Sequence, residues 1–237
     1  MRIDILTLFS QTFTGVFEES IIKRAREKEA ISIHLHNLRD FGLGSRKTVD
    51  DTPFGGGAGM VLKVDVVHGA LKYILKSQNP LFKPHVILLS SSGVKYNQKK
   101  AATLASLNHL VLVCGHYEGV DERVLNFCDE EISVGDFVLS GGEIPAMVIV
   151  DSVVRLIPHV LGSPNSLKEE SFNESTREGK QVKLLEYPQY TRPPSYLGSK
   201  VPTVLISGNH EEIIKWRLSN AYEKTKRNRP DLLTDKF

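Results

Sequence analysis

Short apolar runs alternate along this chain with segments of helical periodicity, and this alternation limits the folds open to it more than any other feature. The apolar runs expected to form strands are residues 2–8, 31–35, 85–89, 109–114 and 132–134. The segments with helical spacing are residues 17–25, 64–77, 99–107, 120–127 and 144–157. Strands that alternate with helices form a parallel sheet covered on both faces. The pattern therefore predicts an α/β fold.

Three of these strands end in segments that contain glycine. They are residues 90–93, the run G-H-Y-E-G at residues 115–119, and the run G-D-F-V-L-S-G-G at residues 135–142. Glycine permits close backbone approach and positive φ. Because open α/β sheets bind their ligands at the carboxyl ends of the strands, we expect these loops to form a ligand site.

The composition is that of an ordinary soluble globular protein. The 237 residues are 41% hydrophobic and 24% charged, which is enough for one good core and a smaller second domain. The net charge of +2 is too small to indicate nucleic-acid binding by itself. Two cysteines without a C-x-x-C pair favour a reducing compartment. The N-terminus is unlike a signal peptide and no apolar run is long enough to span a membrane, so we expect a cytoplasmic protein.

Two stretches without periodicity interrupt the pattern. Residues 39–60 are expected to form a long loop, and such loops inside compact domains are usually functional or disordered. Residues 162–183 are polar and aperiodic, which is typical of an interdomain linker. The sequence thus predicts a domain of residues 1–161, a linker of residues 162–183 and a small, mostly helical domain of residues 184–237.

The last of these domains contains one segment with clear helix signals. Asn209 stands at a capping position, with Glu212 three residues later. Residues 213–230 contain six cationic side chains, among them Lys215 and Arg217, and a single acidic one. Two interpretations of this basic face stay open, namely a solvated helix surface and a surface that binds phosphate groups.

The glycine loops lack the motifs that bind nucleotide phosphates. None has the spacing G-x-x-x-x-G-K-[ST], and residues 55–59 lack the preceding strand and following helix of a dinucleotide loop. What remains is a pocket of backbone groups, apolar walls and acids, which suits a flat heterocycle with positive charge. The wall residues are Leu88, Tyr117, Val134, Phe137, Leu139 and Pro145, and the acids are Glu118, Asp121, Glu122, Asp136 and Glu143. Capping and salt bridging are the alternative role for these acids, above all for Asp121.

The histidines give no clear metal site. His34 and His36 share one face of an expected strand, but no third ligand lies near them in the sequence. A solvated strand face is the favoured interpretation, and the sequence predicts no built metal site.

Several long motifs resemble one known family. They are T-V-D-D-x-P-F-G-G-G-x-G-M, L-V-C-G-x-Y-E-G-x-D-E-R-V, S-V-G-D-F-V-L-S-G-G-E-x-P-A-M, D-S-V-x-R-x-I-P, Y-T-R-P and S-G-N-H-x-E-I-x-x-W-R. In register across nearly the whole chain, they resemble the bacterial tRNA (guanine-N1)-methyltransferases of the TrmD type, which modify the guanine immediately 3′ of the anticodon. The resemblance implies a knotted (trefoil) α/β domain of the SPOUT superfamily, S-adenosylmethionine as methyl donor, and a homodimer with active sites at the subunit interface.

The resemblance also implies roles for individual residues. The residues expected to bind S-adenosylmethionine are Leu88, Leu89, Ser90, Gly115, Tyr117, Glu118, Val134, Gly135, Phe137, Leu139, Gly141, Gly142 and Pro145. Asp50, Lys215 and Arg217 are candidates for holding the tRNA. Guanine N1 carries a proton, so transfer needs a base to remove it and a cation to hold the charge that moves to O6. Arg155 matches the family's arginine for the second role. Glu170 falls where the family has the residue that acts as the base.

The chain departs from the family's pattern at three places. Glu170 replaces the aspartate of an E-D-S-F sequence, and it keeps a carboxylate on a side chain one methylene longer. Leu88 stands where a tyrosine is expected, and Ser91 where a proline is expected. The stretch between Phe172 and Leu184 is longer than in the family.

Two other functions stay open on the sequence alone. The departures at Glu170 and Leu88 suit a tRNA-binding protein that has kept the fold and lost turnover. A SPOUT methyltransferase for another RNA position is the second alternative, which the motifs Y-T-R-P and S-G-N-H disfavour. Family accounts also implicate Mg²⁺, which stays open as a further requirement.

Overall fold

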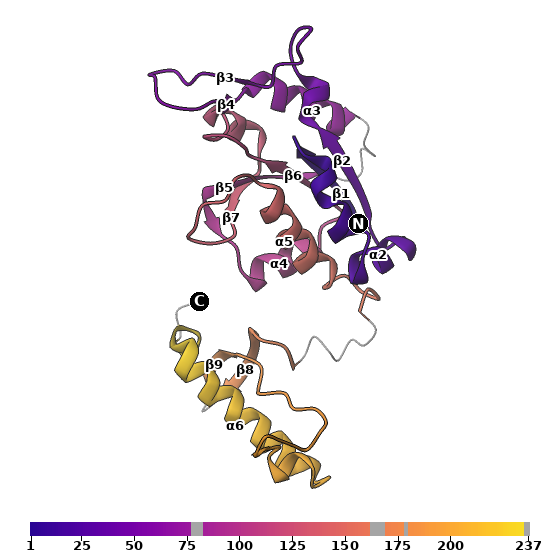
Figure 1. Cartoon of the computed structure of the whole chain (residues 1–237), viewed down its shortest axis with the longest axis vertical. Coiled ribbons are helices and arrows are strands. Elements are labelled where there is room, and N and C mark those ends of the chain that lie inside the picture. The colour runs from indigo at the N-terminus through magenta and orange to yellow at the C-terminus, as the bar shows by residue number, and fades with distance from the viewer. Residues whose placement is uncertain (77–82, 162–168, 178–179, 235–237) are drawn as a thin grey trace. The chain divides into compact units, whose positions relative to one another are not determined.

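The computed structural model describes residues 1–76, 83–161, 169–177 and 180–234. The chain forms two compact units, Met1–Gly162 and Ser163–Phe237, each described here by itself (Figure 1). In the described residues, no helix is both long enough and apolar enough to cross a membrane.

The first unit is built on a sheet of five parallel strands. The strands are β1 (Arg2–Thr7), β2 (Ser32–Asn37), β5 (His85–Lys95), β6 (His109–Cys114) and β7 (Glu130–Ser133). Their order in the sheet is β2-β1-β6-β5-β7, and every neighbouring pair is parallel (Figure 1). This confirms the α/β fold with a parallel sheet that the alternating pattern predicts.

Helices cover both faces of this sheet. One face carries the 3₁₀ helix η1 (Ser10–Phe13) with α1 (Thr14–Phe17), α2 (Ser20–Glu27), α4 (Gln98–Ala105) and α5 (Glu143–Val154). The other face carries α3 (Val64–Lys76) and the 3₁₀ helices η2 (Leu38–Phe41) and η3 (Glu122–Phe127). Successive strand residues alternate between the two hydrophobic clusters, so that Ile87 packs in the first and Val86 in the second. Burial on both faces explains why the strands are continuous apolar runs.

The long loop expected at residues 39–60 holds little regular structure. Near its end, β3 (Asp50–Asp51) pairs in antiparallel fashion with β4 (Val61–Leu62). Between these short strands, Phe54 is fully exposed and is followed by glycines with positive φ. The loop therefore presents an aromatic side chain on a glycine-rich turn.

The helix expected at residues 120–127 forms at Glu122–Phe127, as the tighter 3₁₀ helix η3. Its cap is local. The carboxylate of Asp121 accepts a hydrogen bond from the backbone N–H of Arg123 at 3.0 Å.

Strand β5 is longer than expected. It continues past Leu89 to Lys95, and its register against β7 shifts, since Ile132 lies opposite both Leu89 and Val94. Gly93 permits this approach, because a Cβ added there would lie 2.5 Å from the backbone nitrogen of Ile132. The glycine expected to end the strand instead lets it bulge and continue.

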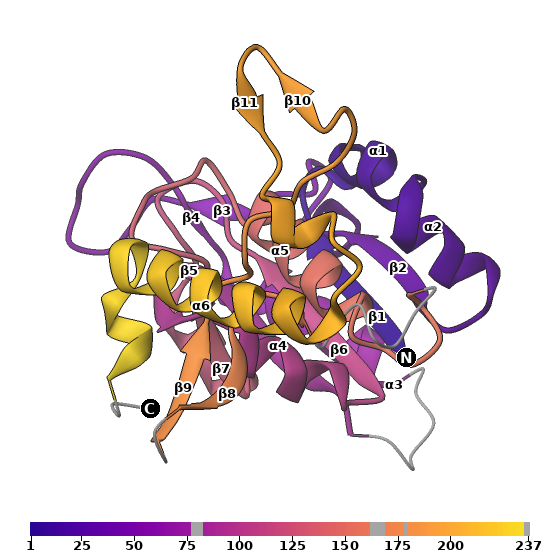
Figure 2. The ribbon, with the colours of Figure 1, turned by 90° about the horizontal axis from the view of Figure 1, so that it is seen from below.

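The second unit contains one long helix, α6 (His210–Asn228). Two antiparallel hairpins precede it, formed by β8 (Asn173–Arg177) with β9 (Lys180–Leu184) and by β10 (Ser195–Tyr196) with β11 (Ser199–Lys200) (Figure 2). The 3₁₀ helices η5 (Thr203–Leu205) and η6 (Pro230–Leu233) flank α6. As predicted, Asn209 caps α6, with its side-chain oxygen accepting the backbone N–H of Glu212.

The segment 162–183 differs from the irregular linker that its composition predicts. Its first part, residues 162–168, lies outside the described residues, but β8 and most of β9 fall within it. The hairpin is held by backbone hydrogen bonds, which form whether the side chains are polar or apolar. The polar composition of this segment therefore did not indicate that it forms strands.

Candidate active site

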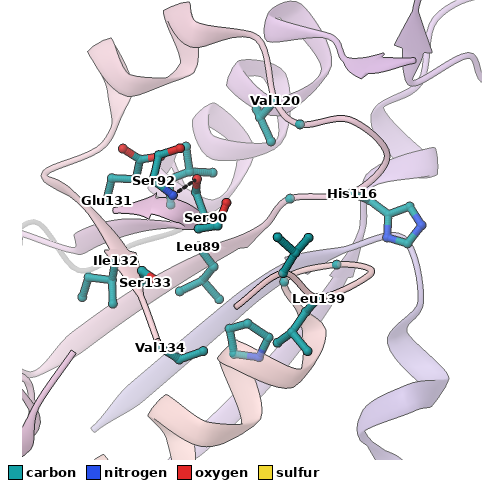
Figure 3. Close-up of a pocket in the computed structure, with 18 of the residues that line it drawn as sticks. Leu89, Ser90, Ser92, His116, Val120, Glu131, Ile132, Ser133, Val134 and Leu139 are labelled. Atoms are coloured by element: carbon teal, nitrogen blue, oxygen red, sulfur yellow. Dashed lines mark hydrogen bonds between the residues drawn. The ribbon is translucent and has the colours of Figure 1, made fainter. Parts of the chain in front are cut away.

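A cavity of about 510 Å³ lies at the carboxyl end of the sheet (Figure 3). Three chain segments line it, namely the last part of β5, the loop after β6, and the stretch from β7 into α5. Every residue expected to bind the methyl donor is in this lining: Leu88, Leu89, Ser90, Gly115, Tyr117, Glu118, Val134, Gly135, Phe137, Leu139, Gly141, Gly142 and Pro145. The fold thus brings together the strand-end loops that the sequence singles out.

Backbone hydrogen bonds to β4 hold the loop after β6. The N–H of Glu118 donates to the carbonyl of Met60 at 3.0 Å, and the N–H of Leu62 donates to the carbonyl of Gly119 at 3.0 Å. Within this loop, Tyr117 has a φ of 62°, a left-handed conformation that is uncommon outside glycine. The surrounding backbone contacts therefore impose the shape of this wall.

The loop between β7 and α5 returns to the end of β6. There the N–H of Gly142 donates to the carbonyl of Gly115 at 2.8 Å, and Gly141 pairs with His116. A Cβ at Gly142 would lie 2.6 Å from the Cα of Cys114, and one at Gly141 would lie 2.5 Å from Nδ1 of His116. Gly142 is therefore required by close backbone approach, whereas the closest atoms to Gly141 belong to side chains.

Apolar side chains of the cavity are left uncovered. Phe137 is 56% exposed and Val138 is 87% exposed, and both line the cavity with Leu139. Such clusters of exposed apolar side chains mark ligand or protein contacts. The wall suits the flat face of a heterocycle.

Acidic side chains also reach the cavity. Glu118 and Glu122 line it as expected, and Glu131 of β7 joins them. Glu131 is missing from the expected set, and it lies opposite Leu88 in the pairing of β5 with β7. Three carboxylates favour a ligand with positive charge over one with phosphate groups.

Two of the five acids expected at the cavity have salt-bridge partners instead. Asp121 binds Arg123 through both carboxylate oxygens, at 2.9 and 2.6 Å, and these hydrogen bonds lower the pKa of Asp121. Asp136 lies 2.7 Å from Nζ of Lys95. This confirms salt bridging as the role of Asp121.

Glu143 is buried at the start of α5. Its Oε1 accepts a hydrogen bond from the hydroxyl of Thr7 at 2.7 Å, and its Oε2 lies 4.0 Å from Nδ1 of His116. In the described part of the chain, this Nδ1 is buried and has no hydrogen-bond partner. A buried polar atom at a cavity wall suits a polar group of a ligand. His116 is missing from the expected set, although its place in the run G-H-Y-E-G marked it.

The other predicted site residues are not part of the cavity lining. Asp50 lies in β3, and Arg155 caps the carboxyl end of α5. Glu170 belongs to the second unit, as do Lys215 and Arg217 on α6.

No cluster of three or more His, Cys, Asp or Glu side chains suited to a metal ion occurs among the described residues. The solvated position favoured for His36 is wrong, because its Nε2 lies 2.6 Å from the buried carboxylate of Asp4. The partner comes from the adjacent strand β1, which sequence spacing does not show.

A model of the family described as tRNA (Guanine-1)-methyltransferase TrmD matches residues 1–235. The chain belongs to this family. A tRNA (guanine-N(1)-)-methyltransferase of Dictyoglomus turgidum is 53% identical over 233 residues, covering 98% of this chain and 90% of that protein. One of Moorella thermoacetica is 51% identical over 234 residues, covering 98% and 90%. One of Bacillus pumilus is 50% identical over 234 residues, covering 98% and 92%.

These comparisons confirm the resemblance inferred from the motifs. The lining of the strand-end cavity indicates the kind of ligand on physical grounds. Its apolar walls, its acids and the buried Nδ1 of His116 fit a ligand that is both flat and cationic.

Proposed function

We propose that this chain transfers the methyl group of S-adenosylmethionine to N1 of the guanine immediately 3′ of the anticodon in tRNA. Membership of the family carries the reaction class, tRNA (guanine-N1)-methylation. The observation that carries the donor site is the cavity at the carboxyl end of the sheet, where three strand-end loops meet.

The cavity supports S-adenosylmethionine as the donor by its size, walls and charge. Its volume of about 510 Å³ lies within the usual range for small-molecule sites. S-adenosylmethionine supplies a methyl group on a cationic sulfonium and leaves as a neutral thioether. Phe137 and Leu139 offer the apolar walls for its ring system, and Glu118 and Glu122 favour its positive charge.

The path of the chain supports a trefoil knot of the SPOUT type. In the sheet, β5 lies between β6 and β7. The segment after β7 nevertheless returns to the end of β6, where Gly142 bonds Gly115, before it enters α5. We infer that this return passes through the loop made by the earlier strands. Because chains normally avoid such threading, the knot is a specific feature of the proposal.

Arg155 and Glu170 are the proposed catalytic residues. Glu170 accepts the proton of guanine N1, which leaves a lone pair on that nitrogen. The bond from N1 to the methyl carbon forms as the bond from that carbon to sulfur breaks. The guanidinium of Arg155 balances the negative charge that shifts to O6 of the base.

Asp50, Lys215 and Arg217 are the proposed contacts to tRNA. Lys215 is mostly exposed on the basic helix α6, which suits contacts to phosphate groups. A target guanine in an anticodon loop is unpaired and is therefore accessible to a pocket of this kind.

A second copy of the chain is the proposed partner. Phe137, Val138, Ile144 and Val148 are exposed apolar residues at or next to the cavity. A second copy that covered them would complete a site between subunits, as the family resemblance implies. Whether methyl transfer requires Mg²⁺ is tested by adding a chelator to the assay.

The decisive experiment is methyl transfer with purified protein and labelled S-adenosylmethionine. The substrate is a tRNA with guanine 3′ of the anticodon, and the control is the same tRNA with adenine at that position. We expect label at N1 of that guanine and none in the control. Failure to label any tRNA with that guanine contradicts the proposal. RNA binding without binding of S-adenosylmethionine identifies a tRNA-binding protein, and label at another nucleotide identifies another target position.

The role of Glu170 is tested by Glu170→Gln. Loss of a general base lowers the rate by roughly 10²–10⁴-fold. The affinity for S-adenosylmethionine, measured by calorimetry, stays unchanged because the donor cavity lies in the first unit. Full activity in this variant assigns the base to another carboxylate.

A further inference from the structure

Glu169, the residue before the proposed base, is held by two side chains of the second unit. The hydroxyl of Tyr187 donates a short hydrogen bond to Oε2 of Glu169. Nη1 of Arg217 lies 3.4 Å from both carboxylate oxygens of Glu169. The three residues are far apart in the sequence and meet where the chain after β9 runs beside α6.

Tyr187 and Arg217 also hold each other. The guanidinium carbon of Arg217 lies 4.7 Å from the centre of the Tyr187 ring, which is cation–π geometry. Tyr187 is buried, at 9% exposed, in a unit with few buried apolar residues. Burial and the hydrogen bond to Glu169 raise the pKa of Tyr187, so the phenol stays protonated as a donor. The carboxylate of Glu169 therefore has two fixed partners.

Backbone contacts anchor the chain on the other side of Glu170. The hydroxyl of Ser171 accepts the N–H of Glu186 at 3.0 Å. The N–H of Phe172 donates to the carbonyl of Leu184 at 2.8 Å. Glu170 is thus flanked by one residue fixed through its side chain and two fixed through hydrogen bonds to the segment after β9.

We propose that Glu169 is a positioning residue, held by Tyr187 and Arg217, which fixes the backbone from which Glu170 reaches the guanine. This inference rests on the proposed function, in which Glu170 is the base. Glutamate has one more rotatable bond than aspartate, so its carboxylate depends more on a fixed backbone. A carboxylate that already accepts bonds from a phenol and a guanidinium is a poor base, which favours a positioning role for Glu169.

The contacts also give Arg217 a role within the unit. Its guanidinium contacts Glu169 and Tyr187 rather than standing free on the basic face of α6. Lys215, two residues earlier, pairs with Glu211 and Glu212 on the same helix. Arg217 therefore acts on the catalytic geometry in addition to its proposed contact with tRNA, whereas the proposed role of Lys215 is tRNA affinity alone.

The test measures kcat and KM across pH for Glu169→Gln, Tyr187→Phe and the double variant. Small displacements of a reacting group cost up to about 100-fold in rate, so we expect kcat to fall by about 10–100-fold in each single variant. The kcat of the double variant falls no further than that of the more affected single variant, because both changes break the same hydrogen bond between Glu169 and Tyr187. KM for S-adenosylmethionine stays unchanged, and the acid limb of the kcat profile remains because Glu170 is intact. Glu169→Asp, which keeps the charge, recovers part of the lost rate.

Matched controls separate positioning from general damage. Glu223→Gln on α6 and Tyr196→Phe on β10 make the same chemical changes at exposed positions of the same unit, and both keep the wild-type kcat. Glu169 is half exposed, so its glutamine variant is expected to fold, and thermal unfolding verifies this.

Three outcomes overturn the inference in distinguishable ways. Wild-type kcat in both Glu169→Gln and Tyr187→Phe, with Glu170→Gln inactive, rejects the positioning role and leaves the proposed function intact. If Glu169→Gln loses both methyl transfer and the acid limb of the kcat profile across pH, while Glu170→Gln stays active, Glu169 is the base. Absence of methyl transfer by the wild-type protein rejects the proposed function, and the positioning role with it.

Discussion

The two units of this chain hold their candidate functional residues by different means. In Met1–Gly162, two hydrophobic clusters enclose a parallel sheet from both sides, and the cavity loops are joined by backbone hydrogen bonds. In Ser163–Phe237, the buried apolar side chains of the described residues are Val182, Tyr187, Ala221 and Leu232. There, polar side-chain contacts fix the segment that carries Glu170.

This difference separates the proposed donor site from the segment that carries the proposed base, Glu170. A pocket whose walls are largely backbone is expected to tolerate the replacement of its side chains, but to lose stability when an added group must displace that backbone. A carboxylate positioned by side chains on a small core tolerates added volume at its surface and is sensitive to the loss of single polar atoms. Substitutions in both units test that contrast.

The largest effect is expected at the buried charge in the first unit. Asp4 is fully buried and lies 2.6 Å from Nε2 of both His36 and His109 and 2.7 Å from Nε of Arg2. Removing one partner of a buried ion pair costs about 3–5 kcal/mol, so Asp4→Asn lowers the unfolding free energy of the first unit by about that amount. Urea denaturation measures this, and exposed Asp40→Asn stays within about 0.5 kcal/mol of wild type.

The same carboxylate makes stability depend on pH. Burial alone raises the pKa of Asp4, but hydrogen bonds from His109, His36 and Arg2 outweigh it and hold the pKa well below its usual value. The folded state thus binds fewer protons than the unfolded state in acid, so the stabilisation is present above about pH 4 and is lost as pH falls below it. Urea midpoints measured from pH 6 to pH 2 show this slope in wild type. A slope of equal size in Asp4→Asn contradicts the assignment.

Added volume at the cavity is the next test. A Cβ at Gly142 meets the backbone of Cys114 at 2.6 Å and of Gly115 at 2.9 Å, so the backbone must shift. We expect Gly142→Ala to cost about 2–3 kcal/mol and to weaken S-adenosylmethionine binding, measured by calorimetry. Gly69→Ala in α3, where a Cβ meets nothing within 4 Å, stabilises by about 0.5–1 kcal/mol. Unchanged donor affinity in Gly142→Ala shows that the loop contact does not shape the site.

Loss of one polar atom tests the second unit. Thr225 is fully buried, and its hydroxyl accepts the N–H of Leu185 at 2.8 Å and donates to the carbonyl of Ala221 at 2.7 Å. Thr225→Val leaves a buried N–H without its acceptor and costs about 1–2 kcal/mol. Thr103→Val in α4 removes only an exposed hydroxyl bond and serves as the control. Scanning calorimetry measures the loss of stability, and the affinity for S-adenosylmethionine is expected to stay unchanged. An equal loss of stability in Thr225→Val and Thr103→Val contradicts the expected difference.

The smallest effect compares one substitution in both units. Asn97 caps α4 in the first unit and Asn209 caps α6 in the second, each through its side-chain oxygen. Replacement by alanine costs about 1 kcal/mol at either cap. The same loss shifts Tm by roughly 4–8 °C in a domain of 60–100 residues and by roughly 2–4 °C in one of 150–250. Asn209→Ala therefore lowers its unit's Tm more than Asn97→Ala does, and equal shifts indicate that the units unfold as one.

The sequence was most informative where a local pattern reflects burial. Strand β6 was expected at residues 109–114 and lies at His109–Cys114, since a strand buried on both faces must be an unbroken apolar run. The cap at Asn209 follows from a side chain that satisfies its own helix end. The glycines of the strand-end loops indicated close backbone approach, which the contacts of Gly142 bear out.

Only the tertiary structure decided which distant polar groups meet. Nothing near Asp4 in the sequence indicates that His36 and His109 reach its carboxylate, because neighbouring strands bring them there. The hairpin of β8 and β9 had no apolar signal, since backbone bonds alone pair it. The same holds for Glu169, Tyr187 and Arg217. Periodicity records the contact of a segment with a core, whereas a hydrogen bond between remote side chains depends on the folded path that places both atoms within 3 to 4 Å of each other.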